Sequence, residues 1–134
     1  MPTRIVLADD EAIIRMDLKE MLTSLGYVVV GEAGDGRTAI NVAREVRPDL
    51  VIMDVQMPDL DGRDATRRWR SGDGGATRVD VPIVAVTAHV AESERVECLS
   101  AGMNDYLSKP FGLEGLQATV RRWISDSEDG TASE

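Results

Sequence analysis

Polar side chains capable of chemistry follow four short apolar runs in this sequence. The residues that end these runs are Asp9 with Asp10, Asp54, Thr87 and Lys109. Short continuous apolar runs are typical of buried parallel strands, and ligands gather outside the carboxyl ends of such strands. We therefore expect three carboxylates, one hydroxyl and one ammonium group to meet at one edge of a sheet.

The crowding of negative charge at this edge implies a bound cation. Two carboxylates in close contact repel each other by about 4 kcal/mol when the effective dielectric constant is about 20. Hard oxygen ligands at an open, hydrated site favour Mg²⁺, which keeps several waters and takes few carboxylates together with phosphate oxygens. These residue types therefore predict a magnesium site that handles a phosphoryl group.

Composition indicates one domain of ordinary size and argues against nucleic acid as a direct partner. The 134 residues are 43% hydrophobic, which is enough for one core, and they carry a net charge of −9. Direct binding of nucleic acid needs clustered Lys and Arg side chains that contact phosphates, so we expect none. We interpret the acidic excess as a solvated, self-repelling surface.

Cysteine content and hydropathy favour a cytoplasmic location. Cys98 is the single cysteine, so a disulfide framework and a cysteine-based metal site are excluded, and a reducing compartment fits. No apolar stretch approaches the roughly 18 residues of a membrane span, and the first residues lack a secretory signal pattern. We therefore expect no direct membrane contact.

Strand and helix patterns alternate five times, which is typical of βαβ units and a parallel sheet. The predicted strands are Arg4–Ala8, Val28–Ala33, Leu50–Asp54, Ile83–Thr87 and Asp105–Ser108. The predicted helices are one that Gly26 closes, one between its cap Asp35 and Pro48, and three over about 61–70, 90–101 and 113–124.

Right-handed crossovers reduce the possible arrangements to a five-stranded, doubly wound α/β sheet. We choose the strand order 2-1-3-4-5 because it brings Asp9, Asp10 and Asp54 together. We expect one domain over residues 1–125, with a glycine-rich loop over 71–80, and a disordered acidic tail over 126–134.

Four stretches carry a resemblance to a known family: LADDE at 7–11, VIMDVQMPDLDG at 51–62, VTA at 86–88 and AGMNDYLSKPF at 101–111. In this order and spacing, the chain resembles the receiver domain of two-component response regulators, the CheY-like family, over residues 3–125. The resemblance implies a flavodoxin-like fold with five helices.

The resemblance also implies a role for each residue of the acidic cluster. Asp54 corresponds to the phosphoacceptor, a nucleophilic carboxylate that forms an acyl phosphate. Asp10 corresponds to a direct Mg²⁺ ligand and Asp9 to one acting through water. Asp54 itself and the main-chain carbonyl of Gln56 complete the implied metal site, while Lys109 contacts a phosphoryl oxygen.

Further residues correspond to those that, in the family, change position on phosphorylation or set the lifetime of the acyl phosphate. Thr87 resembles the hydroxyl that moves to bond the phosphoryl group, and Tyr106 resembles the aromatic side chain that then turns inward. Gln56 and His89 flank the approach of the hydrolytic water, and Pro110 resembles a cis proline that turns the chain after Lys109.

The implied function is to take a phosphoryl group from a histidine kinase or a histidine phosphotransfer protein. Phosphorylation would alter the surface of the fourth helix, fifth strand and fifth helix. The protein would not be an enzyme, apart from catalysing its own phosphorylation and dephosphorylation. We expect a monomer or a weak, phosphorylation-dependent dimer.

Two types of receiver remain open. The first half of the chain resembles free-standing regulators of the antiterminator-linked type, whereas the part from Asp61 onward resembles receiver modules of hybrid histidine kinases. Natural drift, a fusion and a designed chain are all compatible with this blend.

Three other classes fit less well. A phosphohydrolase with a nucleophilic Asp54 would need an acid/base Asp where Gln56 stands, and a flavin protein would need a hydroxyl-rich loop where Asp9 and Asp10 lie. A receiver degenerated to a binding module is disfavoured by the complete set of charged and hydroxyl residues. The glycines of GEAGDG at 31–36 lack phosphate-loop spacing and predict a turn with a helix cap.

Overall fold

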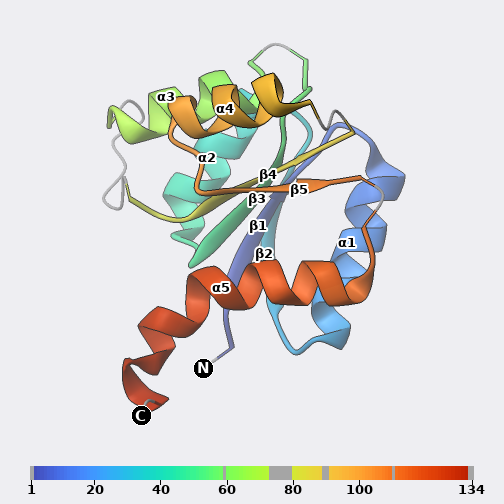
Figure 1. The fold of residues 1–134 in the computed structure, drawn as a ribbon, viewed down its shortest axis with the longest axis vertical. Helices are drawn as coiled ribbons and strands as arrows, with labels where there is room; N and C mark the ends of the chain where they lie inside the picture. The colour runs from blue at the N-terminus through green and yellow to red at the C-terminus, as the bar shows by residue number, and fades with distance from the viewer. Residues whose placement is uncertain (1, 59, 73–79, 89–90, 110, 133–134) are drawn as a thin grey trace.

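Strands and helices alternate along the whole chain of this computed structural model, which describes residues 2–58, 60–72, 80–88, 91–109 and 111–132. The strands are β1 (Arg4–Ala8), β2 (Val28–Ala33), β3 (Leu50–Asp54), β4 (Ile83–Thr87) and β5 (Asp105–Ser108). The helices are α1 (Ala12–Ser24), α2 (Gly36–Val46), α3 (Gly62–Arg70), α4 (Glu92–Ala101) and α5 (Leu113–Ala132) (Figure 1). The strand ranges agree with those predicted from the apolar runs.

The strands form one parallel sheet in the order β2-β1-β3-β4-β5, which confirms the predicted doubly wound α/β fold. Ala8 at the end of β1 pairs with Met53 of β3, and Asp54 pairs with Val86 of β4. Thr87 pairs with Ser108 of β5. The register therefore brings the carboxyl ends of four strands to one edge of the sheet.

Two hydrophobic clusters, one on each face of the sheet, hold the helices in place. Figure 1 shows α2, α3 and α4 on one side of the sheet and α1 and α5 on the other. Val6 and Ala8 of β1 belong to the first cluster, whereas Ile5 and Leu7 belong to the second. This alternation follows from the pleat, which sends successive side chains to opposite faces.

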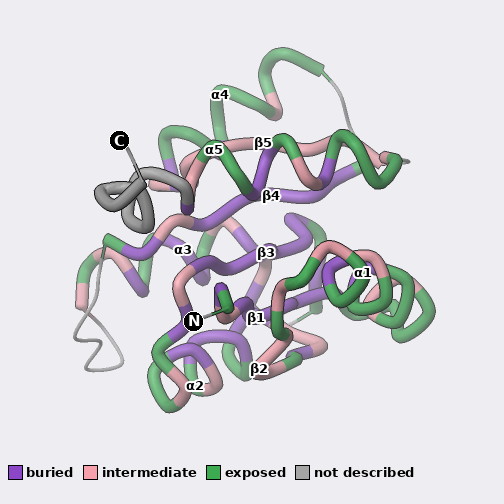
Figure 2. Tube along the Cα trace, turned by 90° about the horizontal axis from the view of Figure 1, so that it is seen from below, coloured by how far each residue is buried: buried purple, intermediate pink, exposed green. Residues whose placement is uncertain are grey.

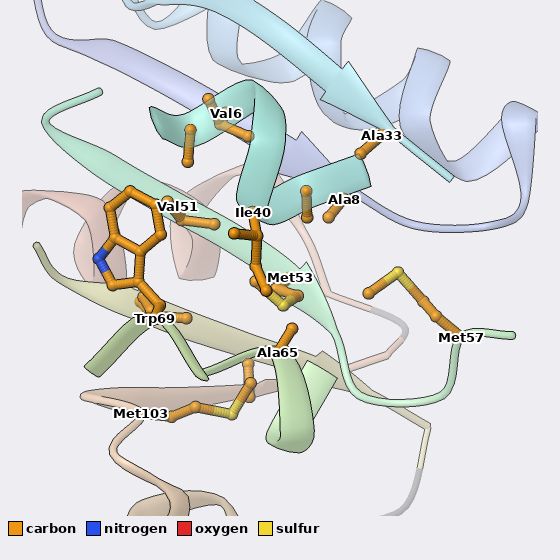
Figure 3. Packing of buried hydrophobic residues seen from close by; sticks show 14 of the residues in the cluster. Val6, Ala8, Ala33, Ile40, Val51, Met53, Met57, Ala65, Trp69 and Met103 are labelled. Atoms are coloured by element: carbon orange, nitrogen blue, oxygen red, sulfur yellow. The ribbon is translucent and has the colours of Figure 1, made fainter. Parts of the chain in front are cut away.

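The central strands are buried on both faces, which explains why they read as continuous apolar runs. All five residues of β3 and of β4 are buried (purple in Figure 2). On the first face, Trp69 of α3 packs near Ile40 of α2 and Val51 of β3, while Ala65 lets α3 approach the sheet closely (Figure 3). Burial of this kind stabilises the fold by roughly 25 cal/mol per Å² of apolar surface.

Capping aspartates begin two helices, and glycines follow the ends of two others. The side chain of Asp35 accepts a hydrogen bond of 2.7 Å from Thr38 N and begins α2, as the GEAGDG stretch predicted. Asp61 accepts one of 2.9 Å from Asp64 N and begins α3. Gly26 after α1 and Gly102 after α4 have φ angles of 94° and 108°, a left-handed backbone that favours glycine.

Two predicted boundaries differ from the structure. Helix α4 begins at Glu92 instead of residue 90, after Ala91 in an extended conformation. Helix α5 continues to Ala132, past the predicted end near residue 124 and into the tail for which we predicted disorder. Residues 113–132 contain no proline, so the sequence permits this continuation. Whether the tail is disordered in solution stays a prediction.

Most of the predicted glycine-rich loop, residues 73–79, lies outside the described residues. Among the helices that are described, none is long and apolar enough to cross a membrane.

Candidate functional site

Three carboxylates meet at the carboxyl edge of the sheet, as the strand-end pattern predicted. Asp9 and Asp10 follow β1, and Asp54 is the last residue of β3. Each offers an oxygen, and these oxygens all lie within 4.8 Å of one another. Asp9 and Asp54 are buried, with 1% and 6% of their surface exposed, whereas Asp10 is exposed. The cluster therefore consists of two buried carboxylates and one that faces solvent.

Lys109 supplies positive charge to this cluster from the end of β5. Its Nζ lies 3.2 Å from Asp9 Oδ2, 3.5 Å from Asp54 Oδ2 and 3.8 Å from Glu11 Oε1. Its main-chain N donates a hydrogen bond of 2.7 Å to Thr87 O, which ties the end of β5 to the end of β4. Burial disfavours its charge, but the carboxylates of Asp54 and Asp9 outweigh this effect and raise the pKa of Lys109.

The surroundings of Asp54 disfavour the ionised form of its carboxyl group. Burial, and then the negative charge of Asp9, raise the pKa of Asp54 from 3.8 to about 6, although Lys109 opposes the shift. Its Oδ1 accepts a hydrogen bond of 3.2 Å from Gln56 N, which orients the carboxylate. At neutral pH Asp54 is therefore ionised and poorly neutralised, which suits a nucleophile or a cation ligand.

Asp9 is oriented by contacts on both its side chain and its main chain. Its Oδ1 accepts a hydrogen bond of 2.9 Å from Glu11 N, while Oδ2 faces Lys109. Its main-chain N donates to Ala33 O at 3.0 Å, and its main-chain O accepts from Arg15 Nη1 at 2.6 Å. Both carboxylate oxygens of Asp9 therefore have protein partners, which hold the side chain in one orientation.

The predicted switch residues, Thr87 and Tyr106, lie on the neighbouring strands β4 and β5. Thr87 is 1% exposed at the end of β4. Tyr106 is half-buried and packs against the hydrophobic cluster of the α2–α3–α4 face. Gln56 is exposed at the rim of the site. His89 and Pro110, for which we predicted roles in lifetime and chain turning, lie outside the described residues.

Two residues with a positioning role escaped the sequence analysis. A Cβ on Gly62 would lie 2.4 Å from Asp54 O, so only glycine lets the start of α3 approach the end of β3 this closely. Arg15 contacts the Asp9 carbonyl from α1. The signal for Gly62 was the DLDG stretch at 59–62, where a glycine follows a helix cap, but Arg15 had no local signal.

The donor set fits Mg²⁺. Carboxylate oxygens at a partly open site are the ligands that this ion prefers, and such a site leaves room for waters and phosphate oxygens. The nearby ammonium of Lys109 does not replace the ion, since it contacts only two of the three aspartates. The residues present can therefore hold a divalent cation between Asp10 and Asp54.

An apolar groove of about 190 Å³ opens next to Lys109, between α1 and the segment after β5. It is lined by Ile14, Asp17, Leu18, Met21, Lys109 and Phe111. Ile13 and Met16 of α1 are 73% and 60% exposed. Large apolar side chains exposed near one another on a helix are typical of a surface that binds another protein.

Comparison with known families and proteins shows what this chain is similar to. The sequence model of the response regulator receiver domain family matches residues 5–121 of this chain. The transcriptional regulatory protein PdtaR of Mycobacterium tuberculosis is 42% identical over all 134 residues. The response regulator MprA of Mycolicibacterium vanbaalenii is 46% identical over 121 residues, which is 90% of this chain. The chain spans 62% and 50% of the lengths of these two relatives.

Solved structures agree with this assignment. The receiver domain of the sensor histidine kinase PA1611 from Pseudomonas aeruginosa is 40% identical, with a TM-score of 0.81, over 93% of this chain and 99% of that one. That structure holds a magnesium ion in its active site cleft. Receiver domains act with histidine kinases and phosphotransfer proteins in two-component systems. The fold, the acidic edge of the sheet and the matched relatives show that this chain belongs to the response regulator receiver domain family.

Proposed function

We propose that Asp54 accepts a phosphoryl group from a phosphohistidine of a histidine kinase or a histidine phosphotransfer protein. The observation that carries this proposal is the convergence of three carboxylates within 4.8 Å, with Lys109 Nζ between Asp9 and Asp54. Such a cluster is costly without a positively charged or electrophilic ligand. It is therefore suited to a phosphoryl group that arrives with a metal ion.

Asp10, Asp54 and the main-chain carbonyl of Gln56 would hold Mg²⁺, with Asp9 acting through a bound water. When bound, the ion would neutralise charge on the phosphoryl oxygens during transfer. The exposure of Asp10 supports its role as a direct ligand. The magnesium ion in the PA1611 receiver supports the choice of metal.

The transfer step uses Asp54 as the nucleophile. A carboxylate oxygen attacks the phosphorus in line with the nitrogen of the phosphohistidine, a P–O bond forms, and the P–N bond breaks. The imidazole leaves with the electron pair of that bond and gains a proton from solvent. The Lys109 ammonium stabilises the oxygens of the transferring group from a position already 3.5 Å from Asp54.

The same site would also lose the phosphoryl group by hydrolysis. A water attacks the phosphorus in line, the bond to Asp54 breaks, and inorganic phosphate leaves. The exposed Gln56 stands at the rim where this water would enter. We expect Gln56 and His89 to set the lifetime of the acyl phosphate. The protein would catalyse only its own phosphorylation and dephosphorylation.

The output would be a change of surface on α4, β5 and α5. Thr87 would bond the new phosphoryl oxygens, and Tyr106 would turn inward into the space that this movement leaves. The half-burial of Tyr106 against the α2–α3–α4 cluster supports a side chain with two available positions. Val96, Leu99 and Leu113 are exposed by 49%, 41% and 44% on this surface, which supports its use in binding a target.

The phosphoryl donor would dock on α1 and the segment after β5. The groove there opens at Lys109, so an apolar helix seated in it would bring a histidine to the acidic cluster. We expect this domain to work in the cytoplasm, as a monomer or a weak dimer, without direct contact with nucleic acid. A free-standing regulator and a module of a hybrid kinase both fit, since relatives of both types match.

Incubation with acetyl phosphate and Mg²⁺, followed by intact mass measurement, tests the proposal. We expect one phosphoryl group to be added to the protein, and none with a chelator or with Asp54→Asn. If no adduct forms, a stable beryllofluoride complex would indicate rapid hydrolysis. Folded protein that binds neither phosphoryl nor beryllofluoride would contradict the proposal.

A further inference from the structure

We infer that Arg15 is a positioning residue for the proposed metal site, because it fixes the peptide that joins Asp9 to Asp10. The inference rests on the proposed binding of Mg²⁺ by these aspartates. Arg15 would contact neither the ion nor the phosphoryl group. It would act through the main chain of the loop between β1 and α1.

The guanidinium of Arg15 bridges two segments that are far apart in the sequence. Its Nη1 donates a hydrogen bond of 2.6 Å to Asp9 O, and its Nε donates one of 3.2 Å to Glu32 Oε1 on β2. The side chain is only 22% exposed. A Cβ on Gly34 would lie 3.6 Å from Nη1, so the segment after β2 packs against the Arg15 guanidinium.

These two contacts of Arg15 fix the orientation of the peptide between Asp9 and Asp10, and so the position of Asp10. The carbonyl of Asp9 and the nitrogen of Asp10 belong to one planar peptide, so fixing the carbonyl fixes the whole plane. The preceding nitrogen of Asp9 is already held by Ala33 O. Arg15 therefore restrains the one remaining polar group of the main chain before Asp10, whose side chain is exposed.

Charge and geometry predict opposite effects when Arg15 is replaced. A positive side chain near an anionic site repels Mg²⁺, so its removal should strengthen binding if only charge matters. If Arg15 positions Asp10, its removal should weaken binding, because the loop must be ordered when the ion binds. The sign of the change in Mg²⁺ affinity therefore separates the two explanations.

The chain offers a matched control in Lys19. Lys19 carries the same charge on the same helix, and its Nζ lies 3.3 Å from Oε2 of the same Glu32. Lys19 contacts Glu32, whereas Arg15 contacts both Glu32 and the Asp9 carbonyl. Lys19→Met therefore removes a similar charge and leaves the Asp9–Asp10 peptide in place.

The experiment is calorimetric titration of the whole chain with Mg²⁺ at neutral pH and constant ionic strength. We expect Arg15→Met to weaken binding by about tenfold, the usual size of such an effect. Arg15→Lys should also weaken it, by several-fold, because a point donor cannot replace a planar fork that makes both contacts. Lys19→Met should bind Mg²⁺ as tightly as the wild type, or more tightly.

Unchanged or tighter binding by folded Arg15→Met would overturn the inference, as would equal weakening by Lys19→Met. Circular dichroism and urea unfolding establish that each variant is folded. Should Arg15→Met not fold, Arg15→Lys decides in the same way, since it keeps the charge and the long stem. A wild type that binds no Mg²⁺ would instead contradict the proposed function itself.

Discussion

The ionised side chain of Asp54 destabilises the folded protein when no metal is bound. Its pKa of about 6 in the folded chain exceeds the ordinary value of 3.8, first because of burial and then because of Asp9. The folded state therefore binds a proton more tightly than the unfolded state does. Stability from this group is greatest at acid pH and falls as the pH rises from about 4 to about 6.

Asp54→Asn should remove this cost. The difference in pKa is equivalent to about 3 kcal/mol above pH 6, and this figure already includes the attraction to Lys109. We expect the variant to be more stable by about 1–3 kcal/mol at neutral pH without metal, with no gain at acid pH. Urea unfolding in the presence of a chelator, over this pH range, checks it. An equal gain at every pH would contradict the electrostatic explanation.

At the scale of elements, the close approach of α3 to β3 depends on Gly62. A Cβ there would lie 2.4 Å from Asp54 O and 3.1 Å from the Cα of Val55, both of which are backbone atoms that cannot move aside alone. The Gly62 N also donates a hydrogen bond of 2.9 Å to Val55 O. The first turn of α3 is therefore fixed to the segment that carries Asp54, the proposed phosphoacceptor.

Gly62→Ala should destabilise the protein by about 1–3 kcal/mol, the usual cost of overpacking, and should slow phosphorylation of Asp54. Gly115 on α5 is the matched control, because a Cβ there would meet nothing within 4 Å. Gly115→Ala should be neutral or stabilising by up to about 1 kcal/mol, since alanine favours helices. Urea unfolding of both variants checks this pair; equal effects would show that the contact at Asp54 does not matter.

The elements were largely predictable because they depend on local patterns. Apolar runs such as Leu50–Asp54 predict strands, and the polar residues at their ends were sufficient to choose the strand order. The contact of Arg15 with Asp9 was not predictable, since it depends on how α1 is rotated on the sheet. Helix α5 extends to Ala132, beyond the last apolar position Ile124 from which the sequence predicted its extent, because the apolar pattern marks only the part of a helix that packs on the core.

At the scale of the whole molecule, net charge couples metal binding to stability. The chain carries a charge of −9, and three of its carboxylates are crowded at one edge of the sheet. A ligand that binds only the folded state stabilises it by mass action, by about 2.7 kcal/mol at a hundred times its dissociation constant. Binding of Mg²⁺ at the proposed site should therefore raise the melting temperature.

We expect millimolar Mg²⁺ to raise the melting temperature of the wild type by several degrees, and Asp10→Asn to reduce the rise. Sodium chloride at matched ionic strength controls for general screening of the negative surface. Calorimetry or fluorescence melting measures both. A rise of the same size with sodium chloride alone would indicate screening and would count against a specific metal site.

The most direct test of the central claim is to identify the residue that carries the phosphoryl group. Borohydride reduces an acyl phosphate to an alcohol, so treatment after acetyl phosphate should convert the modified aspartate to homoserine. We predict that peptide mass mapping will find homoserine at position 54 alone, and only when Mg²⁺ is present. Homoserine at Asp9, Asp10 or another position, with Asp54 unmodified, would contradict the account.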